Sequence, residues 1–191
     1  MISPRMRPRS SLILASAVLA ALAPVAAMTR ADAAPTRRCP TADLDVWLKV
    51  ETGGGAAGSF YYKLEFTNLS PSACTLSGYP GVSAVDLHGH QIGAPARRER
   101  FHAPRTVRLA SDASAVAVLR VTDAGNYRAA SCHGTLAAGV RVYPPGETRS
   151  RIVPFPFSAC SQTTVHILAV RSLEPGAVAA SIAGTLAQRA N

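Results

Sequence analysis

The chain has 191 residues, 48% of them hydrophobic and 16% charged, and its 20 Lys and Arg against 11 Asp and Glu give a formal net charge of +9 at pH 7. This length supports one domain with a sizeable core, and no linker composition divides it into two domains. The basic excess suits anionic wall polymers or lipid headgroups. It lacks the interleaved aromatic residues that a platform for single-stranded nucleic acid needs, so we expect no nucleic-acid partner.

Residues 1–33 follow the order of a secretory signal peptide. Arginines come first, an apolar run spans residues 12–27, and the small-residue stretch Ala31-Asp32-Ala33 follows. The apolar run is shorter than the roughly 20 residues that cross a bilayer as a helix, and no later segment is long and apolar enough to do so. We predict cleavage after Ala33, with Ala27 as the alternative.

Export determines what we expect of the mature protein. Arg37 and Arg38 precede Cys39, whereas a lipid-attachment motif resembles Leu-small-small-Cys, so we expect no lipoprotein. Because residues 1–33 contain four Arg and one Asp, their removal leaves a net charge of about +6. We predict a protein that is secreted or associated with the cell envelope, with no transmembrane span after cleavage.

Four cysteines lie after the predicted signal peptide, and an even number in an exported chain indicates two disulfides. Three pairings are open. We favour Cys39–Cys74 and Cys132–Cys160, since each closes a loop of roughly 30 residues and would stabilise the fold by about 3.5–4 kcal/mol in the chain-entropy treatment. No pair has the C-x-x-C spacing typical of zinc or redox sites.

Apolar and polar residues alternate at a period of two along much of the chain, which indicates strands with one buried face. Gly- and Pro-rich turns separate these segments, as in an all-β sandwich or barrel. The alternating segments cover residues 44–50, 60–67, 115–121, 140–142 and 165–173.

The connections are also suggested by composition. The glycine-rich segment 52–59 joins the first two strands as a hairpin or a crossover. Residues 82–87 and 91–93 are expected to form a second hairpin across His88-Gly89-His90, and residues 94–104 a basic loop that contains proline.

The chain therefore divides into a signal peptide at 1–33, a β domain at 34–173 and an Ala-rich C-terminal tail at 174–191. The tail is expected to be either a short helix or a disordered end. No internal repeat is visible in the β domain.

Two histidines at the predicted hairpin tip are the sharpest candidates for chemistry. His88 and His90 are separated by one glycine, and His102 follows in the next loop. Such a set would suit Cu(II) or Zn(II). The interpretation we favour is a polar tip with solvated imidazoles, because one His-x-His pair is a weak signal.

Catalytic arrangements are less well supported. There is no Gly-x-Ser-x-Gly elbow. Asp43, Asp45 and Glu51 alternate along one expected strand face, but that face lies opposite the apolar residues and should be wet. A solvated carboxylate lacks the raised pKa that a general acid requires, so we predict no catalytic residues.

The only local basic cluster is Arg97-Arg98-Glu99-Arg100, with Arg105 and Arg108 nearby. We take Arg97, Arg98 and Arg100 as the first candidate binding residues. The competing interpretation is that these arginines are dispersed solvating groups.

Several motifs resemble a known family. The segments are Phe66-Thr67-Asn68-Leu69-Ser70, Cys74-Thr75-Leu76-Ser77-Gly78-Tyr79-Pro80-Gly81-Val82, Gln91-Ile92-Gly93, the 107–119 region, and Arg141-Val142-Tyr143-Pro144-Pro145-Gly146 followed by Cys160. They are similar to a secreted actinobacterial domain-of-unknown-function family, numbered forty-two thirty-two, found in mycobacteria, streptomycetes and relatives. The resemblance implies an immunoglobulin-like antiparallel β-sandwich of about seven to nine strands, exported or envelope-associated, and implies no catalytic residues. Within it, we expect Asn68 to end a strand by accepting the positive φ of a turn.

The sequence thus predicts a non-catalytic binding or structural module without a cofactor. The partner classes that we consider are an anionic cell-envelope polymer and an envelope protein. The alternative is an exported metal-binding protein or enzyme that uses His88, His90 and His102.

Overall fold

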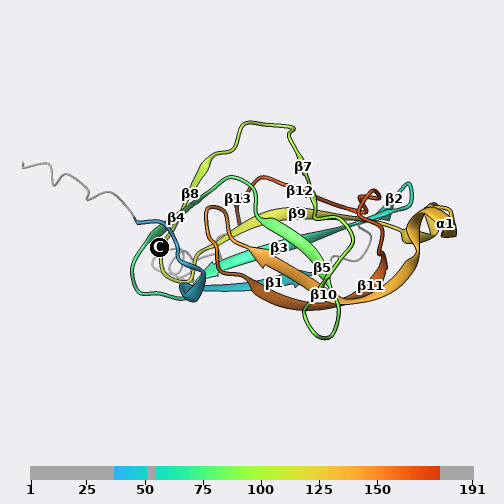
Figure 1. Cartoon of the computed structure of the whole chain (residues 1–191). Coiled ribbons are helices and arrows are strands. Elements are labelled where there is room, and N and C mark those ends of the chain that lie inside the picture. Colours follow the sequence, from blue (N-terminus) through green and yellow to red (C-terminus); the bar gives the residue numbers. More distant parts are fainter. Residues whose placement is uncertain (1–36, 51–54, 177–191) are drawn as a thin grey trace, which may run out of the picture. The chain divides into compact units, whose positions relative to one another are not determined.

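The computed structural model describes residues 37–50 and 55–176, and this part of the chain is mostly β (Figure 1). The predicted signal peptide and the tail beyond Gly176 lie outside the described residues. In chain order the elements are η1 (Thr41–Asp43), β1 (Leu44–Lys49), β2 (Gly55–Ala56), β3 (Ser59–Asn68), β4 (Cys74–Ser77), β5 (Gly81–Val85), β6 (Gln91–Ile92), β7 (Arg97–Glu99), β8 (Thr106–Leu109), β9 (Ser114–Thr122), η2 (Ala124–Asn126), α1 (Ala129–Cys132), β10 (Gly134–Tyr143), β11 (Arg151–Cys160), β12 (Leu168–Arg171) and β13 (Glu174–Pro175).

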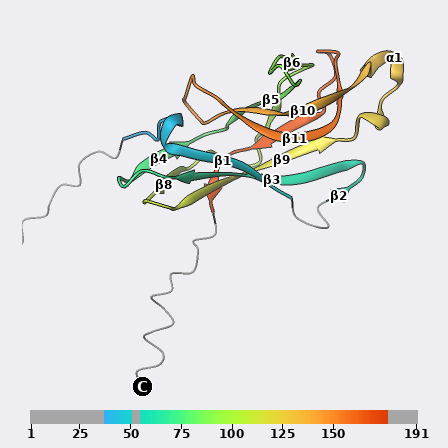
Figure 2. The same ribbon diagram turned by 90° about the horizontal axis from the view of Figure 1, so that it is seen from below.

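Within the described residues these strands form three sheets. The largest has seven strands in the order β1-β3-β9-β12-β7, with β2 paired to β3 and β13 paired to β9. A second sheet has the order β11-β10-β5-β6, and β4 and β8 form a third. Figure 2 shows the first two sheets as separate layers. Because β1 pairs antiparallel with β3, the first connection is a hairpin rather than a crossover.

The strands that alternate most regularly bury the residues expected of them. In β9, every second side chain from Ala115 to Val121 is buried. In β3, Leu64 and Phe66 are fully buried, and Val140 and Val142 of β10 join them in one hydrophobic cluster. The apolar faces of the two larger sheets therefore share a single core, and burial of these faces is the main source of stability.

The longest strand that the sequence pattern misses is β11, which pairs with β10. Pro154 and Pro156 disguise it, since proline cannot donate to a ladder and normally argues against a strand. Here β11 lies at the edge of its sheet, where proline is tolerated because one side of the strand has no hydrogen-bonded neighbour. The register shifts beside Gly139, where a Cβ would collide with the Val153 carbonyl oxygen.

Two predicted boundaries are wrong. The 94–104 loop contains strand β7, which pairs in parallel with β12. The strand predicted over 165–173 begins only at Leu168, and three successive residues of it are buried instead of alternating. The reason is its interior position: Ala169 is a small residue that lies in register between Arg120 of β9 and Arg97 of β7.

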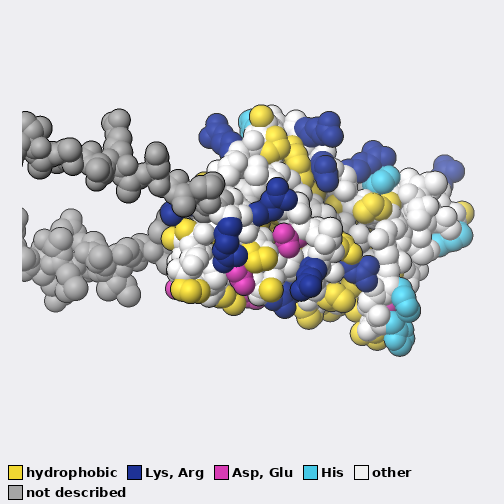
Figure 3. Space-filling model, turned by 60° about the vertical axis from the view of Figure 1, so that its left-hand side comes forward, with side chains coloured by type: hydrophobic (Ala, Val, Ile, Leu, Met, Phe, Trp, Pro, Cys, Tyr) yellow, Lys and Arg dark blue, Asp and Glu magenta, His cyan; other side chains and the backbone are white. Residues whose placement is uncertain are grey.

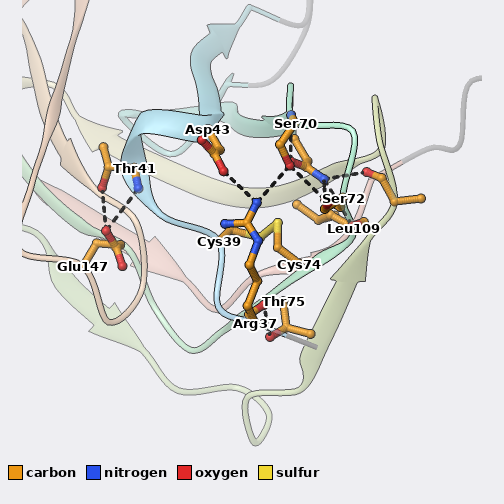
Figure 4. Close-up of a disulfide and its surroundings, with 12 residues drawn as sticks. Arg37, Cys39, Thr41, Asp43, Ser70, Ser72, Cys74, Thr75, Leu109 and Glu147 are labelled. Atoms are coloured by element: carbon orange, nitrogen blue, oxygen red, sulfur yellow. Dashed lines mark hydrogen bonds and ion pairs between the residues drawn. A yellow bond between two sulfur atoms is a disulfide. The ribbon is translucent and has the colours of Figure 1, made fainter. Parts of the chain in front are cut away.

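Both disulfides tie sequence-distant strands together. Cys39 bonds Cys74 with an S–S distance of 2.01 Å, and Cys132 bonds Cys160 at 1.97 Å. These are the two pairings that loop length favours. The first joins the segment before η1 to the start of β4 (Figure 4). The second joins the end of α1 to the end of β11.

Asn68 has a different role from the one expected, because its backbone does not adopt a positive φ. Its side chain is fully buried, and its Nδ2 donates to the carbonyl oxygens of Ser72 at 2.9 Å and Ala110 at 3.0 Å. Its Oδ1 accepts from the Ser70 backbone N–H and hydroxyl. The amide thus fastens the end of β3 to the turns before β4 and after β8.

We predict that Asn68→Ala lowers the free energy of unfolding by about 2–4 kcal/mol, because it leaves buried carbonyl and N–H groups without partners. Chemical denaturation followed by circular dichroism measures the change. The control is Leu69→Ala at the neighbouring exposed position, which should cost less than about 1 kcal/mol. Equal losses for the two variants would contradict the assigned role of the amide.

Candidate functional site

Strand β7 and the residues after it present the predicted arginine cluster on the surface. Arg97, Arg98 and Arg100 are all exposed. Because successive side chains of a strand point to opposite faces, Arg97 shares the face of Glu99, and Arg98 lies on the other face, where it lines a hollow with Arg100. Glu99, between them, accepts from Arg120 Nε at 2.8 Å and from Arg171 Nε at 3.4 Å. The one carboxylate of the cluster is therefore engaged by arginines of β9 and β12. In the described part of the chain no acidic side chain pairs with the three exposed guanidinium groups.

One aromatic ring lies beside an arginine of the cluster, and a second lies beside Arg171 of β12. The guanidinium carbon of Arg98 is 5.8 Å from the centroid of the Tyr79 ring, and that of Arg171 is 4.8 Å from the Phe101 ring. Both distances suit cation–π attraction, which holds a guanidinium over a ring. We call Arg97, Arg98, Arg100, Tyr79 and Phe101 the arginine surface. Sequence reasoning missed Tyr79, which comes from the turn before β5 and meets the cluster only in the fold.

The arginine surface borders shallow hollows. One is lined by Tyr79, Arg98 and Arg100 together with residues 101–104. A neighbouring hollow lies between Phe101 and Glu174, next to Arg171. Figure 3 shows Lys and Arg side chains spread around hydrophobic patches on one face, with few acidic groups among them. The arrangement suits an extended anionic ligand better than an enclosed small molecule.

The histidines of the hairpin tip are held by Asp86. Gly89 makes the turn with φ +80°, and Asp86 Oδ1 accepts from the backbone N–H groups of His88 at 2.9 Å and His90 at 2.8 Å. Asp86 Oδ2 lies 3.2 Å from His90 Nδ1. The hydrogen bond from the His90 backbone is the main reason that the pKa of Asp86 lies below its ordinary value.

The structure places His102 in the hollows beside the arginine surface, on a different loop from His88 and His90. Across residues 37–50 and 55–176, no three or more His, Cys, Asp or Glu side chains are grouped to hold a metal ion. The His88 and His90 ring centroids are 6.0 Å apart and accompany a single carboxylate.

The carboxylates expected along one face of the first strand do not line up on it. Asp43 belongs to η1, not to β1, and forms an ion pair with Arg37 at 2.7 Å (Figure 4). Asp45 is exposed on β1, and Glu51 lies outside the described residues. The 3-10 turn before β1 takes Asp43 off the strand, so Asp43 and Asp45 do not share a strand face.

Family comparison agrees with the motifs. Residues 39–179 match the family described as domain of unknown function DUF4232. The chain belongs to this family. A comparison of the DUF4232 chain with curated proteins and with solved structures finds no match. No helix in the described part of this DUF4232 protein is long and apolar enough to cross a membrane.

We predict that Asp86→Asn lowers the melting temperature at pH 7 and that the loss disappears in acid. A carboxyl whose folded pKa lies below its unfolded value, here 3.8, stabilises the fold above that pH and ceases to do so as the pH falls through the folded pKa. Melting curves of the two proteins between about pH 7 and pH 3 make the comparison. A difference that stays constant over this range would show that the charge of Asp86 is irrelevant.

Proposed function

We propose that this DUF4232 protein is a non-catalytic module, exported to the cell envelope, that binds an anionic envelope polymer through its arginine surface. Three exposed guanidinium groups carry the proposal, together with the contacts of Arg98 with the Tyr79 ring and of Arg171 with the Phe101 ring. Guanidinium forks bind phosphate and carboxylate groups with paired hydrogen bonds and stack on rings, which an ammonium group does less well. A polymer with repeated phosphate or carboxylate groups would engage Arg98 and Arg100 along the hollow that they line, and would reach Arg97 across the edge of the sheet.

Export is supported by two independent features. Both disulfides are of the kind that persists in oxidising compartments. The first 33 residues have the composition and order of a cleavable signal peptide. The family match adds membership of DUF4232 but no activity.

The finer fold assignment belongs to the same proposal. We propose that the two larger sheets form an immunoglobulin-like sandwich, because they share one core and present their connecting loops at the borders of the domain. The parallel pairing of β7 with β12 departs from a purely antiparallel arrangement. It adds an edge strand that carries Arg97 and Arg98, so the departure itself creates the candidate surface.

We expect the triple variant R97A/R98A/R100A to bind isolated cell walls at least about tenfold more weakly than the parent protein, since each charge-assisted hydrogen bond contributes roughly 1.5–3 kcal/mol. Co-sedimentation with purified walls measures the affinity. The matched control is R38A/R128A/R149A, which removes the same charge from three exposed positions outside the cluster. The control should change binding by less than about threefold, apart from the general loss that salt also produces.

Two further probes test the ligand class. Vesicles with anionic lipid and a single-stranded oligonucleotide are measured with the same three proteins. Tight binding to either probe, with weak binding to walls, would refute an envelope polymer as the ligand. Equal wall binding by the triple variant and the control would refute the arginine surface as the site.

A further inference from the structure

Strand β1 forms one edge of the seven-stranded sheet, with β3 on its inner side and, among the described residues, no strand hydrogen-bonded to its outer side. Strand β11 of the second sheet packs close to β1 without pairing with it. Just beyond the ladder, the Leu69 N–H donates to the Asp43 carbonyl oxygen at 2.9 Å. Bonded and non-bonded pairs alternate in an antiparallel ladder, so the odd-numbered residues of β1 exchange hydrogen bonds with β3. Val46 and Leu48 therefore direct their N–H and C=O groups toward the open edge.

Strand β11, the long edge strand of the second sheet, is protected against pairing in a way that β1 is not. Strand β11 also lies at a sheet edge, but Pro154 and Pro156 remove two donors from it. Proline on an edge strand is a common protection against pairing with another chain. Strand β1 is six residues long, contains neither proline nor glycine, and keeps its edge donors.

The outward-facing side chains of β1 carry opposite charges on the two sides of Trp47. Trp47 is 40% exposed on the outer face of the sheet, with exposed Asp45 two residues before it and exposed Lys49 two residues after it. The opposite charges lie at equal distances from the tryptophan. A strand with this pattern is complementary in charge to an antiparallel copy of itself.

We propose that two copies of the protein associate by antiparallel pairing of their β1 edges about a twofold axis at Trp47. Val46 of each copy then exchanges backbone hydrogen bonds with Leu48 of the other, which satisfies the edge groups. Asp45 faces Lys49 of the second copy on both sides of the axis, and the two Trp47 rings meet at the centre. These are non-hydrogen-bonded positions, where facing side chains come closest.

Each of these contacts is of a kind that stabilises sheets. Aromatic pairs and opposite charges across two strands contribute favourably, whereas like charges directly opposite are unfavourable. A single pair of six-residue strands is smaller than a standard stable interface. We therefore expect a dimer that dissociates on dilution in the micromolar range or above.

Charge reversal provides the test. The protein is exported from the full-length chain, purified from the periplasm, and followed by sedimentation equilibrium over a wide concentration range. D45K and K49D should each weaken association at least about tenfold, because each places like charges opposite one another twice. The double variant D45K/K49D restores opposite charges and should return the dissociation constant to within about threefold of the parent value.

Folding and location are monitored separately. Trp47 is the only tryptophan of the chain, so a shift in its emission with protein concentration reports burial at the axis. Circular dichroism and melting temperature check that each variant folds. They also report any gain in stability of K49D, which would place a carboxylate opposite Lys63 in β3. R128D is the control for a charge reversal at another exposed position and should leave the dimer unchanged.

A parent protein that stays monomeric at the highest concentration would overturn the proposal. A dimer that is indifferent to D45K and K49D, or one that the double variant fails to restore, would also overturn it. Loss of association in R128D would show that general charge, rather than the β1 edge, controls the dimer.

Discussion

The ladder between β3 and β9 joins the two halves of the largest sheet. Ser59 to Thr67 lie opposite Thr122 to Ser114, so the paired residues are far apart in sequence. Strands β1 and β2 attach only to β3, and β12 and β13 attach to β9. A slip of one residue would turn Leu64 and Phe66 out of the core, because side chains alternate with a period of two. Every other pairing in this sheet depends on the register of that ladder.

Such long-range pairing is costly in chain entropy, and the covalent links reduce that cost. The Cys39–Cys74 bond closes a loop that contains β1, β2 and β3, and the Cys132–Cys160 bond closes one that contains β10 and most of β11. Asn68 adds a non-covalent link beside the first bond, since its buried amide joins the end of β3 to the turns before β4 and after β8. Disulfides of this kind persist in oxidising compartments, which agrees with the proposed export.

The two edges of the seven-stranded sheet have different proposed roles. Strand β7 at one edge presents the arginine surface, and β1 at the other presents an open, charge-complementary backbone. The whole width of the sheet separates them, so pairing through β1 would leave the arginines of both copies accessible. A dimer would then offer two anion-binding surfaces to one polymer, and bivalent contact raises overall affinity without any new bond. Weak association and weak polymer binding would in that case reinforce each other.

Local pattern in the sequence was enough for β1, β3 and β9, because alternation records directly which face of a strand is buried. The hairpin of β5 and β6 was predicted from the turn at His88-Gly89-His90 instead, since four successive residues of β5 are buried. Local pattern also gave the even cysteine count and the arginine cluster, and it predicts an export signal, because all of these are contiguous or countable features. Strands β7 and β11 escaped it, since arginine and proline are poor strand signals unless the strand is known to lie at an edge. The meeting of Tyr79 with Arg98, the burial of Asn68 and the open side of β1 were decided only by tertiary structure. Each depends on which distant segments become neighbours, and that outcome is set by packing of the whole core rather than by local pattern.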